Sequence, residues 1–228
     1  MTDPAPPAVT RILLVRHGQS LANSGERTAD PDTNPLTELG RVQARSFVDR
    51  LDCKPTLFVV SPFLRAQQTA EPLRQKFPDV PVEEWPIHEF TFLEPSEHRN
   101  TNEDEREPHV VDYWHRGDPA YVAGPEAESF IAFLDRAREA IRRLIHKNPG
   151  GCVVIFTHGY FIQAFRLVLL FPNATDSELM ANFRRFHFVN LIQNIDSLEF
   201  ELRGGKIHLI GQPHLTDFTL FQGENTHV

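Results

Sequence analysis

Short runs of consecutive apolar residues alternate along the chain with longer stretches in which apolar positions recur every three or four residues. The short runs are almost wholly apolar, which is typical of strands buried on both faces of a sheet. The predicted strands are residues 12–15, 57–60 and 152–156, with a weaker one around residues 82–85. Residues 198–202 instead alternate apolar and acidic positions, and a glycine pair separates them from a run at 207–210. That pattern predicts a C-terminal β-hairpin.

The longer stretches predict helices that follow the strands. Thr37 is a suitable N-cap for the first helix, and Ser61 with Pro62 provides a cap and a first helical residue for the second. Pro72 is expected to bend or end that second helix. The predicted helices are residues 38–51, about 61–71, about 102–116, 127–147 and 159–170.

Strands that alternate with helices predict a parallel sheet covered on both faces. The expected fold is therefore an α/β three-layer sandwich, with a mostly parallel sheet and a C-terminal β-hairpin. Residues 1–10 are rich in proline and predict a flexible N-terminal arm. Residues 11–228 are expected to form a single domain, in which the polar segment at about 90–125 is an insertion that acts as a lid.

Composition narrows the class of protein. The 228 residues include 31 acidic and 23 basic ones, so the net charge is −8, which argues against nucleic-acid or membrane-surface partners. Residues 1–9 lack the features of a signal peptide, and the apolar stretch at 152–171 fits a strand and a buried helix better than a membrane span. Cys53 and Cys152 do not provide a disulfide scaffold, and a reducing, cytoplasmic location fits.

Basic residues follow three of the predicted strands. Arg16 and His17 follow the first, Arg65 lies shortly after the second, and His158 follows the last. The carboxyl ends of parallel strands meet at one edge of a sheet, so these side chains should converge in an otherwise acidic protein. Arg65 also stands in the first turn of a helix, where a cation opposes the helix dipole and a functional reason is expected.

This cluster matches a compact anion with several charges, and a phosphoryl group fits best. The guanidinium of an arginine can donate two hydrogen bonds at once to phosphoryl oxygens. Zinc is the competing ligand for His17 and His158. Adjacent arginines would repel a dication, and no third ligand stands at a usual spacing, so we expect no metal.

Several segments resemble the histidine phosphatase superfamily, which includes the cofactor-dependent phosphoglycerate mutases. The resemblance covers about residues 11–215 and rests on three motifs in the family's order. These are RHGQSLAN at 16–23, SPFLRAQQTAE at 61–71 and THG at 157–159, with LTELG at 36–40 as a further family-like segment. Ser20 replaces the common threonine and keeps its hydroxyl.

The acidic segment departs from the family pattern. IHEFTFL at 87–93 stands where many members carry a glutamate followed by a glycine- and tryptophan-rich stretch. The resemblance aligns Glu89 with the family's proton donor, and Glu94 is the alternative. An ordinary surface carboxylate is the plainer interpretation of Glu89.

The resemblance implies a two-step phosphoryl transfer that needs no metal and no organic cofactor. Neutral His17 attacks phosphorus, and Glu89 protonates the leaving oxygen and then helps to activate water. Arg16, Arg65 and His158 are the other expected catalytic residues, because they neutralise the phosphoryl oxygens. The expected phosphate-binding residues are Arg16, Gly18, Asn23, Arg65, His158 and Gly159. Gly18 is expected to let the backbone approach the phosphate.

Three functional classes stay open at this level. A phosphomonoester hydrolase acting on a phosphorylated small molecule is favoured, because acidic residues outnumber basic ones in the insertion. A phosphoglycerate mutase would need more cations there for a carboxylate and a second phosphate. A non-catalytic module that binds a phosphorylated ligand is the third class. The sequence identifies neither the substrate nor the oligomeric state, and a homodimer stays open.

Overall fold

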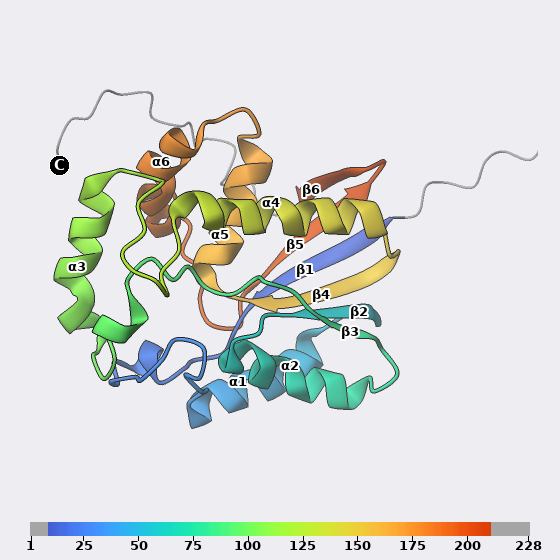
Figure 1. Cartoon of the computed structure of the whole chain (residues 1–228). Helices are drawn as coiled ribbons and strands as arrows, with labels where there is room; N and C mark the ends of the chain where they lie inside the picture. Colours follow the sequence, from blue (N-terminus) through green and yellow to red (C-terminus); the bar gives the residue numbers. More distant parts are fainter. Residues whose placement is uncertain (1–8, 211–228) are drawn as a thin grey trace, which may run out of the picture.

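The computed structural model describes residues 9–210, in which one six-stranded sheet runs through the centre (Figure 1). The strand order is β3-β2-β4-β1-β5-β6, in which β1 to β4 are mutually parallel and β5 and β6 form an antiparallel hairpin. The strands are β1 (Thr10–Arg16), β2 (Pro55–Val60), β3 (Val82–Glu84), β4 (Gly151–Thr157), β5 (Ser197–Arg203) and β6 (Lys206–Ile210).

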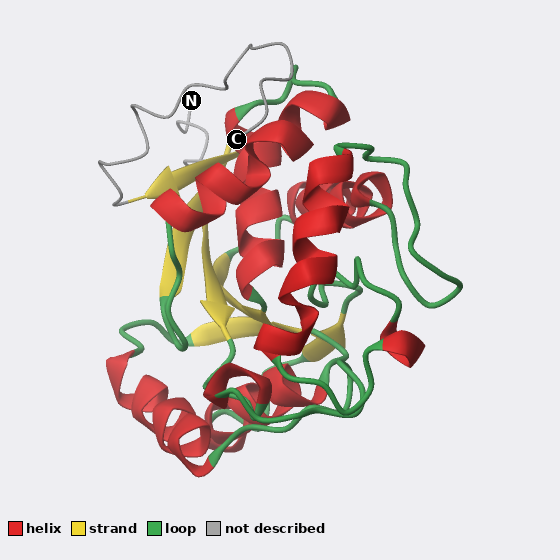
Figure 2. Cartoon of the chain, turned by 90° about the vertical axis from the view of Figure 1, so that its left-hand side faces the viewer, coloured by secondary structure: helices red, strands yellow, loops and turns green. Residues whose placement is uncertain are grey.

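Helices cover both faces of the sheet, as Figures 1 and 2 show from two directions. One core, which includes Val15, Phe58 and Phe156, lies between the sheet and α1 and α2. The other, which includes Ile12, Phe133 and Phe183, lies under α3 to α6. The α-helices are α1 (Glu38–Arg50), α2 (Leu64–Lys76), α3 (Glu103–Arg116), α4 (Phe130–Lys147), α5 (Gly159–Leu170) and α6 (Asp176–Val189), with short 3-10 turns at Ala22–Ser24 and Pro95–Glu97. The predicted three-layer α/β fold is confirmed.

The second helix differs from its prediction at both ends. Its N-cap is Phe63, not Ser61, because the Ser61 hydroxyl bonds His158 instead of capping the first turn. The helix also continues past Pro72 to Lys76. Leu73 is almost completely buried beneath it, and this packing outweighs the missing N–H of the proline.

Helix α6 was not predicted. It has a capping box in which the Thr175 hydroxyl accepts from the Glu178 N–H and the Glu178 side chain accepts from the Thr175 N–H. Arginines interrupt its apolar stripe, although Leu179, Phe183 and Phe186 are buried. The cap alone could have located its start.

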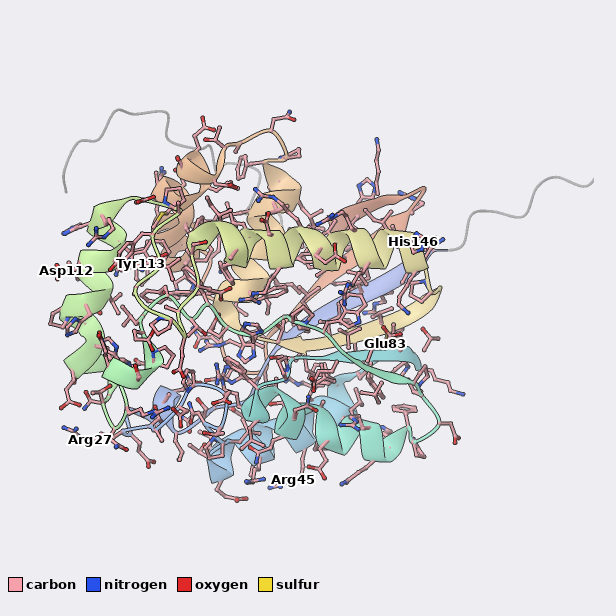
Figure 3. The ribbon with its side chains drawn as sticks, in the orientation of Figure 1. Arg27, Arg45, Glu83, Asp112, Tyr113 and His146 are labelled. Atoms are coloured by element: carbon pink, nitrogen blue, oxygen red, sulfur yellow. A yellow bond between two sulfur atoms is a disulfide. The ribbon has the colours of Figure 1, made fainter. Side chains whose placement is uncertain are left out.

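The insertion packs onto the core through aromatic side chains. Trp114 of α3 stacks on Phe183 of α6 with ring centroids 5.5 Å apart, and Phe90 stacks on Phe133 of α4 at 4.4 Å. Helix α3 turns Tyr113 toward the body of the protein and Asp112 away from it (Figure 3). These contacts fix the insertion beside the carboxyl ends of the strands.

Cys53 and Cys152 are joined in a disulfide, with their Cα atoms 6.4 Å apart. This cross-link corrects the expectation of two cysteines in reduced form. It ties the segment between α1 and β2 to the start of β4, which the 99-residue separation in sequence concealed.

The described residues contain no helix that is both long enough and apolar enough to cross a membrane. Most of the predicted N-terminal arm lies outside the described residues, although Thr10 already belongs to β1. The last part of the predicted domain, 211–228, lies outside them as well.

Candidate active site

Strand register brings the basic residues to one edge of the sheet. Arg16 pairs with Thr157 across β1 and β4, and Val60 pairs with Phe156 across β2 and β4, so the three strands end together. The residues that follow them are therefore neighbours. The imidazole rings of His17 and His158 have centroids 5.0 Å apart, and Arg65 Nε lies 3.0 Å from His17 Nε2.

Local hydrogen bonds fix the protonation of His17. Its Nδ1 lies 2.7 Å from the carbonyl oxygen of Gly18, which can only accept, so Nδ1 carries the proton. Nε2 then has a free electron pair, which accepts from Arg65 Nε. Burial, and then the charges of Arg65 and Arg16, lower the pKa of His17 well below its usual 6.5. The ring is neutral and its unprotonated nitrogen is Nε2.

The two arginines are held by backbone carbonyls. Arg16 Nη1 donates to Ile192 at 2.6 Å, and Arg65 Nη1 donates to Pro31 at 2.5 Å. Arg16 Nε is buried and has no partner among the described residues. Burial lowers the pKa of Arg65 to about 10, so its guanidinium still carries its charge at neutral pH. Within residues 9–210, both cations therefore stand beside the His17 ring without a carboxylate hydrogen-bonded to them.

The loop between α6 and β5 donates hydrogen bonds to the backbone carbonyls of Arg16 and His17. Ile195 N–H donates to the Arg16 carbonyl, and Asn194 Nδ2 donates to the His17 carbonyl at 3.0 Å. Ile195 has a φ of 66°, a left-handed conformation that is costly for a β-branched residue and that suggests a functional constraint. No motif marks this loop in the sequence, and Asn194 was not predicted as a site residue.

His158 is fully buried and bonds Ser61, whose Oγ lies 2.7 Å from Nε2. Its other nitrogen, Nδ1, has no partner within the described residues. Burial, followed by Arg65 and His17, keeps the pKa of His158 well below 6.5, so this ring is neutral too. Ser61 was predicted as a helix cap, and its contact with His158 was not foreseen.

Glu89 joins the same cluster. Its carboxylate accepts from the backbone N–H groups of Tyr160 and Phe90 at 3.1 and 3.2 Å. Burial raises the pKa of Glu89 above its usual value, against the opposing effect of Arg65 and Arg16. A carboxyl group that holds its proton to a higher pH is suited to donate it.

Glu94, the alternative acid, has a different position. It is 2 % exposed, and its oxygens accept from the Ser96 hydroxyl at 2.8 Å and the Glu126 N–H at 3.0 Å. Although burial acts to raise its pKa, these hydrogen bonds lower it. The Glu94 side chain therefore ties together two parts of the loop around the insertion.

Contacts within the protein place Gly18, Gly159 and Asn23, and their binding of phosphate stays a prediction. Gly18 N–H donates to Thr69 Oγ1, and a Cβ at Gly18 would lie 2.6 Å from the Gly40 carbonyl oxygen. The close approach at Gly18 is therefore to the start of α1. A Cβ at Gly159 would lie 3.5 Å from Arg16 Nε, so that glycine leaves room for the guanidinium. Asn23 Oδ1 accepts from Ser20 and Asn194.

A cavity of about 270 Å³ opens over this cluster. Its base contains Arg16, His17, Arg65, Glu89 and Asn23, while His158, Gly18 and Gly159 lie outside its lining. The insertion supplies much of the wall, and the residues it contributes are Phe90, Thr91, Phe92, Leu93, Pro95, His98, Glu103, Arg106 and Val110. Within residues 9–210, no group of three or more His, Cys, Asp or Glu side chains is arranged to hold a metal ion.

Comparison with known proteins identifies the family of the chain. The family model "Histidine phosphatase superfamily (branch 1)" matches residues 12–209. A metal-independent phosphoserine phosphatase from Arabidopsis thaliana is 27 % identical over 83 % of this chain and 81 % of its own length. A 2,3-bisphosphoglycerate-dependent phosphoglycerate mutase from Gloeobacter violaceus is 29 % identical over 69 % of this chain and 74 % of its own length.

Solved structures share the fold. A mycobacterial glucosyl-3-phosphoglycerate phosphatase superposes with a TM-score of 0.66 at 22 % identity, covering 89 % of this chain and 97 % of that one. A phosphoserine phosphatase from Entamoeba histolytica gives 0.66 at 18 % identity, covering 89 % and 95 %. The family expected from the motifs is confirmed: the chain belongs to branch 1 of the histidine phosphatase superfamily.

Proposed function

We propose that the protein is a phosphomonoester hydrolase that acts without a metal through a phosphohistidine on His17. One observation carries this proposal: a neutral imidazole in the lining of the cavity keeps Nε2 unprotonated beside two arginines whose recorded hydrogen bonds go to backbone carbonyls and to His17 itself. That nitrogen is a nucleophile, and its surroundings attract a phosphoryl group.

The chemistry runs in two steps. His17 Nε2 attacks phosphorus, the ester P–O bond breaks, and protonated Glu89 gives its proton to the leaving oxygen. Water then attacks the phosphohistidine, the Glu89 carboxylate takes a proton from that water, and inorganic phosphate leaves with His17 restored. Arg16, Arg65 and His158 are proposed to offset the charge on the phosphoryl oxygens, with Asn23 as a further phosphate ligand.

The cavity wall favours hydrolysis of a small monophosphate ester. Arg106 is the only arginine or lysine that the described part of the insertion contributes to the lining, and its Nη1 is already bonded to the Thr101 carbonyl at 2.8 Å. A bisphosphate or phosphoglycerate would need more positive charge than this wall offers. Similarity to a phosphatase of phosphoserine supports a small phosphorylated metabolite as the substrate class.

Phosphoglycerate mutase is the second candidate, because one relative with that activity is 29 % identical. Interconversion of 2- and 3-phosphoglycerate in the presence of the bisphosphate, followed by phosphorus NMR, would favour it. A cytoplasmic location, the absence of nucleic-acid partners and a homodimer stay predictions.

The decisive experiment replaces the nucleophile. His17→Ala should lose at least about a thousandfold in turnover of para-nitrophenyl phosphate, because no other group forms the covalent intermediate. The wild type, quenched in alkali during turnover, should carry one acid-labile phosphoryl group on the peptide that contains His17. His146→Ala is the matched control, since His146 is exposed at the far end of α4 (Figure 3). Retained activity in His17→Ala would refute the mechanism.

A further inference from the structure

The Ser61 hydroxyl is enclosed in the protein beside the candidate catalytic cluster. Ser61 is 0 % exposed, and its N–H donates to the Phe156 carbonyl, which fixes the residue at the end of β4. Its Oγ accepts from the Phe63 N–H at 3.3 Å and lies 2.7 Å from His158 Nε2. No other acceptor for the hydroxyl proton is recorded within the described residues.

Hydrogen-bond satisfaction decides the direction of this bond. If His158 Nε2 carried the proton, the Ser61 hydroxyl proton would be buried without an acceptor, and Nδ1 would be an unpaired acceptor. If Ser61 donates to Nε2, the hydroxyl is satisfied on both sides and only Nδ1–H lacks a partner. A buried unpaired polar group is costly, so the second arrangement is favoured.

The position of the remaining N–H, on His158 Nδ1, favours an anion as its partner. His158 Nδ1 is buried and unpartnered in the described structure, on a ring whose centroid lies 5.0 Å from that of His17. His158 is also the N-cap of α5, where backbone N–H groups and the helix dipole favour negative charge. We propose that Ser61 is a positioning residue that holds His158 as the Nδ1–H tautomer, so that Nδ1 donates to a phosphoryl oxygen.

This assignment rests on the proposed function, since it supposes a phosphoryl group beside His17. It adds a specific role for Ser61: without the hydroxyl, Nε2 becomes free to take the proton, and Nδ1 then turns an electron pair toward the anion. A hydrogen bond to a charged group is replaced by a repulsive contact, so anion affinity should fall about tenfold to a hundredfold.

The tautomer can be measured without any variant. In protein with nitrogen-15 histidine, long-range proton–nitrogen correlation should show His158 protonated at Nδ1, with assignment by comparison with His158→Gln. A wild-type ring protonated at Nε2 would overturn the proposal. This readout stays usable if a substitution at the buried Ser61 prevents folding.

Variants test the consequence. Ser61→Ala should shift His158 toward the Nε2–H form and raise the vanadate dissociation constant about tenfold to a hundredfold, and Ser61→Thr should restore much of the affinity. Ser129→Ala is the matched control, because it removes the N-cap of α4 and destabilises the fold away from the cluster.

Unchanged vanadate affinity in folded Ser61→Ala, or an equal loss in Ser129→Ala, would refute the role of Ser61. If His17→Ala instead keeps its activity, the hydrolytic mechanism fails, while the tautomer and the vanadate constants still test Ser61.

Discussion

At the scale of single residues, one environment shifts the pKa values of two opposite chemical groups in opposite directions. Burial disfavours charge on both, so it lowers the pKa of His17 and raises that of Glu89. Arg65 and Arg16 strengthen the effect on His17 and oppose it on Glu89. A nucleophile whose Nε2 carries no proton and an acid that keeps its proton to a higher pH than usual can therefore coexist in the same cavity.

The role of Glu89 is tested by comparing leaving groups. Glu89→Gln should slow hydrolysis of an alkyl phosphate about a hundredfold or more, because the alkoxide needs a proton, and para-nitrophenyl phosphate much less. In the wild type, the ratio of alkyl to nitrophenyl rates should fall as pH rises through the raised pKa of Glu89, because the alkyl ester depends more strongly on the acid. Steady-state kinetics across pH measures both.

The control for this substitution is Glu97→Gln, which replaces an exposed carboxylate in the same insertion. Equal losses on the two substrates would exclude Glu89 as the acid, and a leaving-group-dependent loss in Glu94→Gln would move the role there.

At this scale, the position of a site residue could be predicted from the sequence where its side chain comes at the end of a strand. Arg16, His17 and His158 could be placed together because parallel strands end at a common edge. Ser61 and Asn194 could not be assigned, because their partners lie 97 and 171 or more residues away in sequence and no local rule links them.

At the scale of elements, helices with a clear apolar face or a wholly apolar stretch could be located from the sequence. Helix α4 was predicted with its end at Lys147 correct, and α5 was predicted with both ends correct. Tertiary packing decided the rest. Helix α6 buries Phe183 and Phe186, which have two arginines between them, and α2 continues through a proline that local rules take as a stop.

Pro72 therefore offers a test of packing against propensity. Pro72→Ala restores the N–H that can donate to the Gln68 carbonyl, so the free energy of unfolding should rise by about 1–3 kcal/mol. Pro72→Gly restores the same N–H but should be about 1 kcal/mol less stable than the alanine variant. Urea unfolding measures both, and an alanine variant no more stable than wild type would show that the proline ring itself contributes packing.

At the scale of the whole molecule, the candidate catalytic cluster and the disulfide lie at opposite ends of the central strands. Arg16 ends β1, and His17 and His158 directly follow β1 and β4. Cys152 instead lies at the start of β4 and bonds Cys53. The five residue-to-residue steps along the strand from Cys152 to Thr157 correspond to roughly 17 Å. The overall fold could be predicted from strand–helix alternation, but the disulfide could not, since two cysteines far apart in sequence carry no geometric information.

This separation predicts that the disulfide affects stability and leaves catalysis unchanged. Closing a loop of this length restricts the unfolded chain, so reduction, or Cys53→Ser with Cys152→Ser, should lower the free energy of unfolding by about 2–4 kcal/mol. Thermal unfolding with and without dithiothreitol measures the loss, and the double variant should show no further change on reduction. Turnover of para-nitrophenyl phosphate, well below both melting temperatures, should be equal in the two redox states, because the strand ends are held by the two cores and not by the cross-link. Two free thiols in the untreated protein would refute the cross-link, and a loss of turnover on reduction would show that the start of β4 is coupled to the catalytic edge.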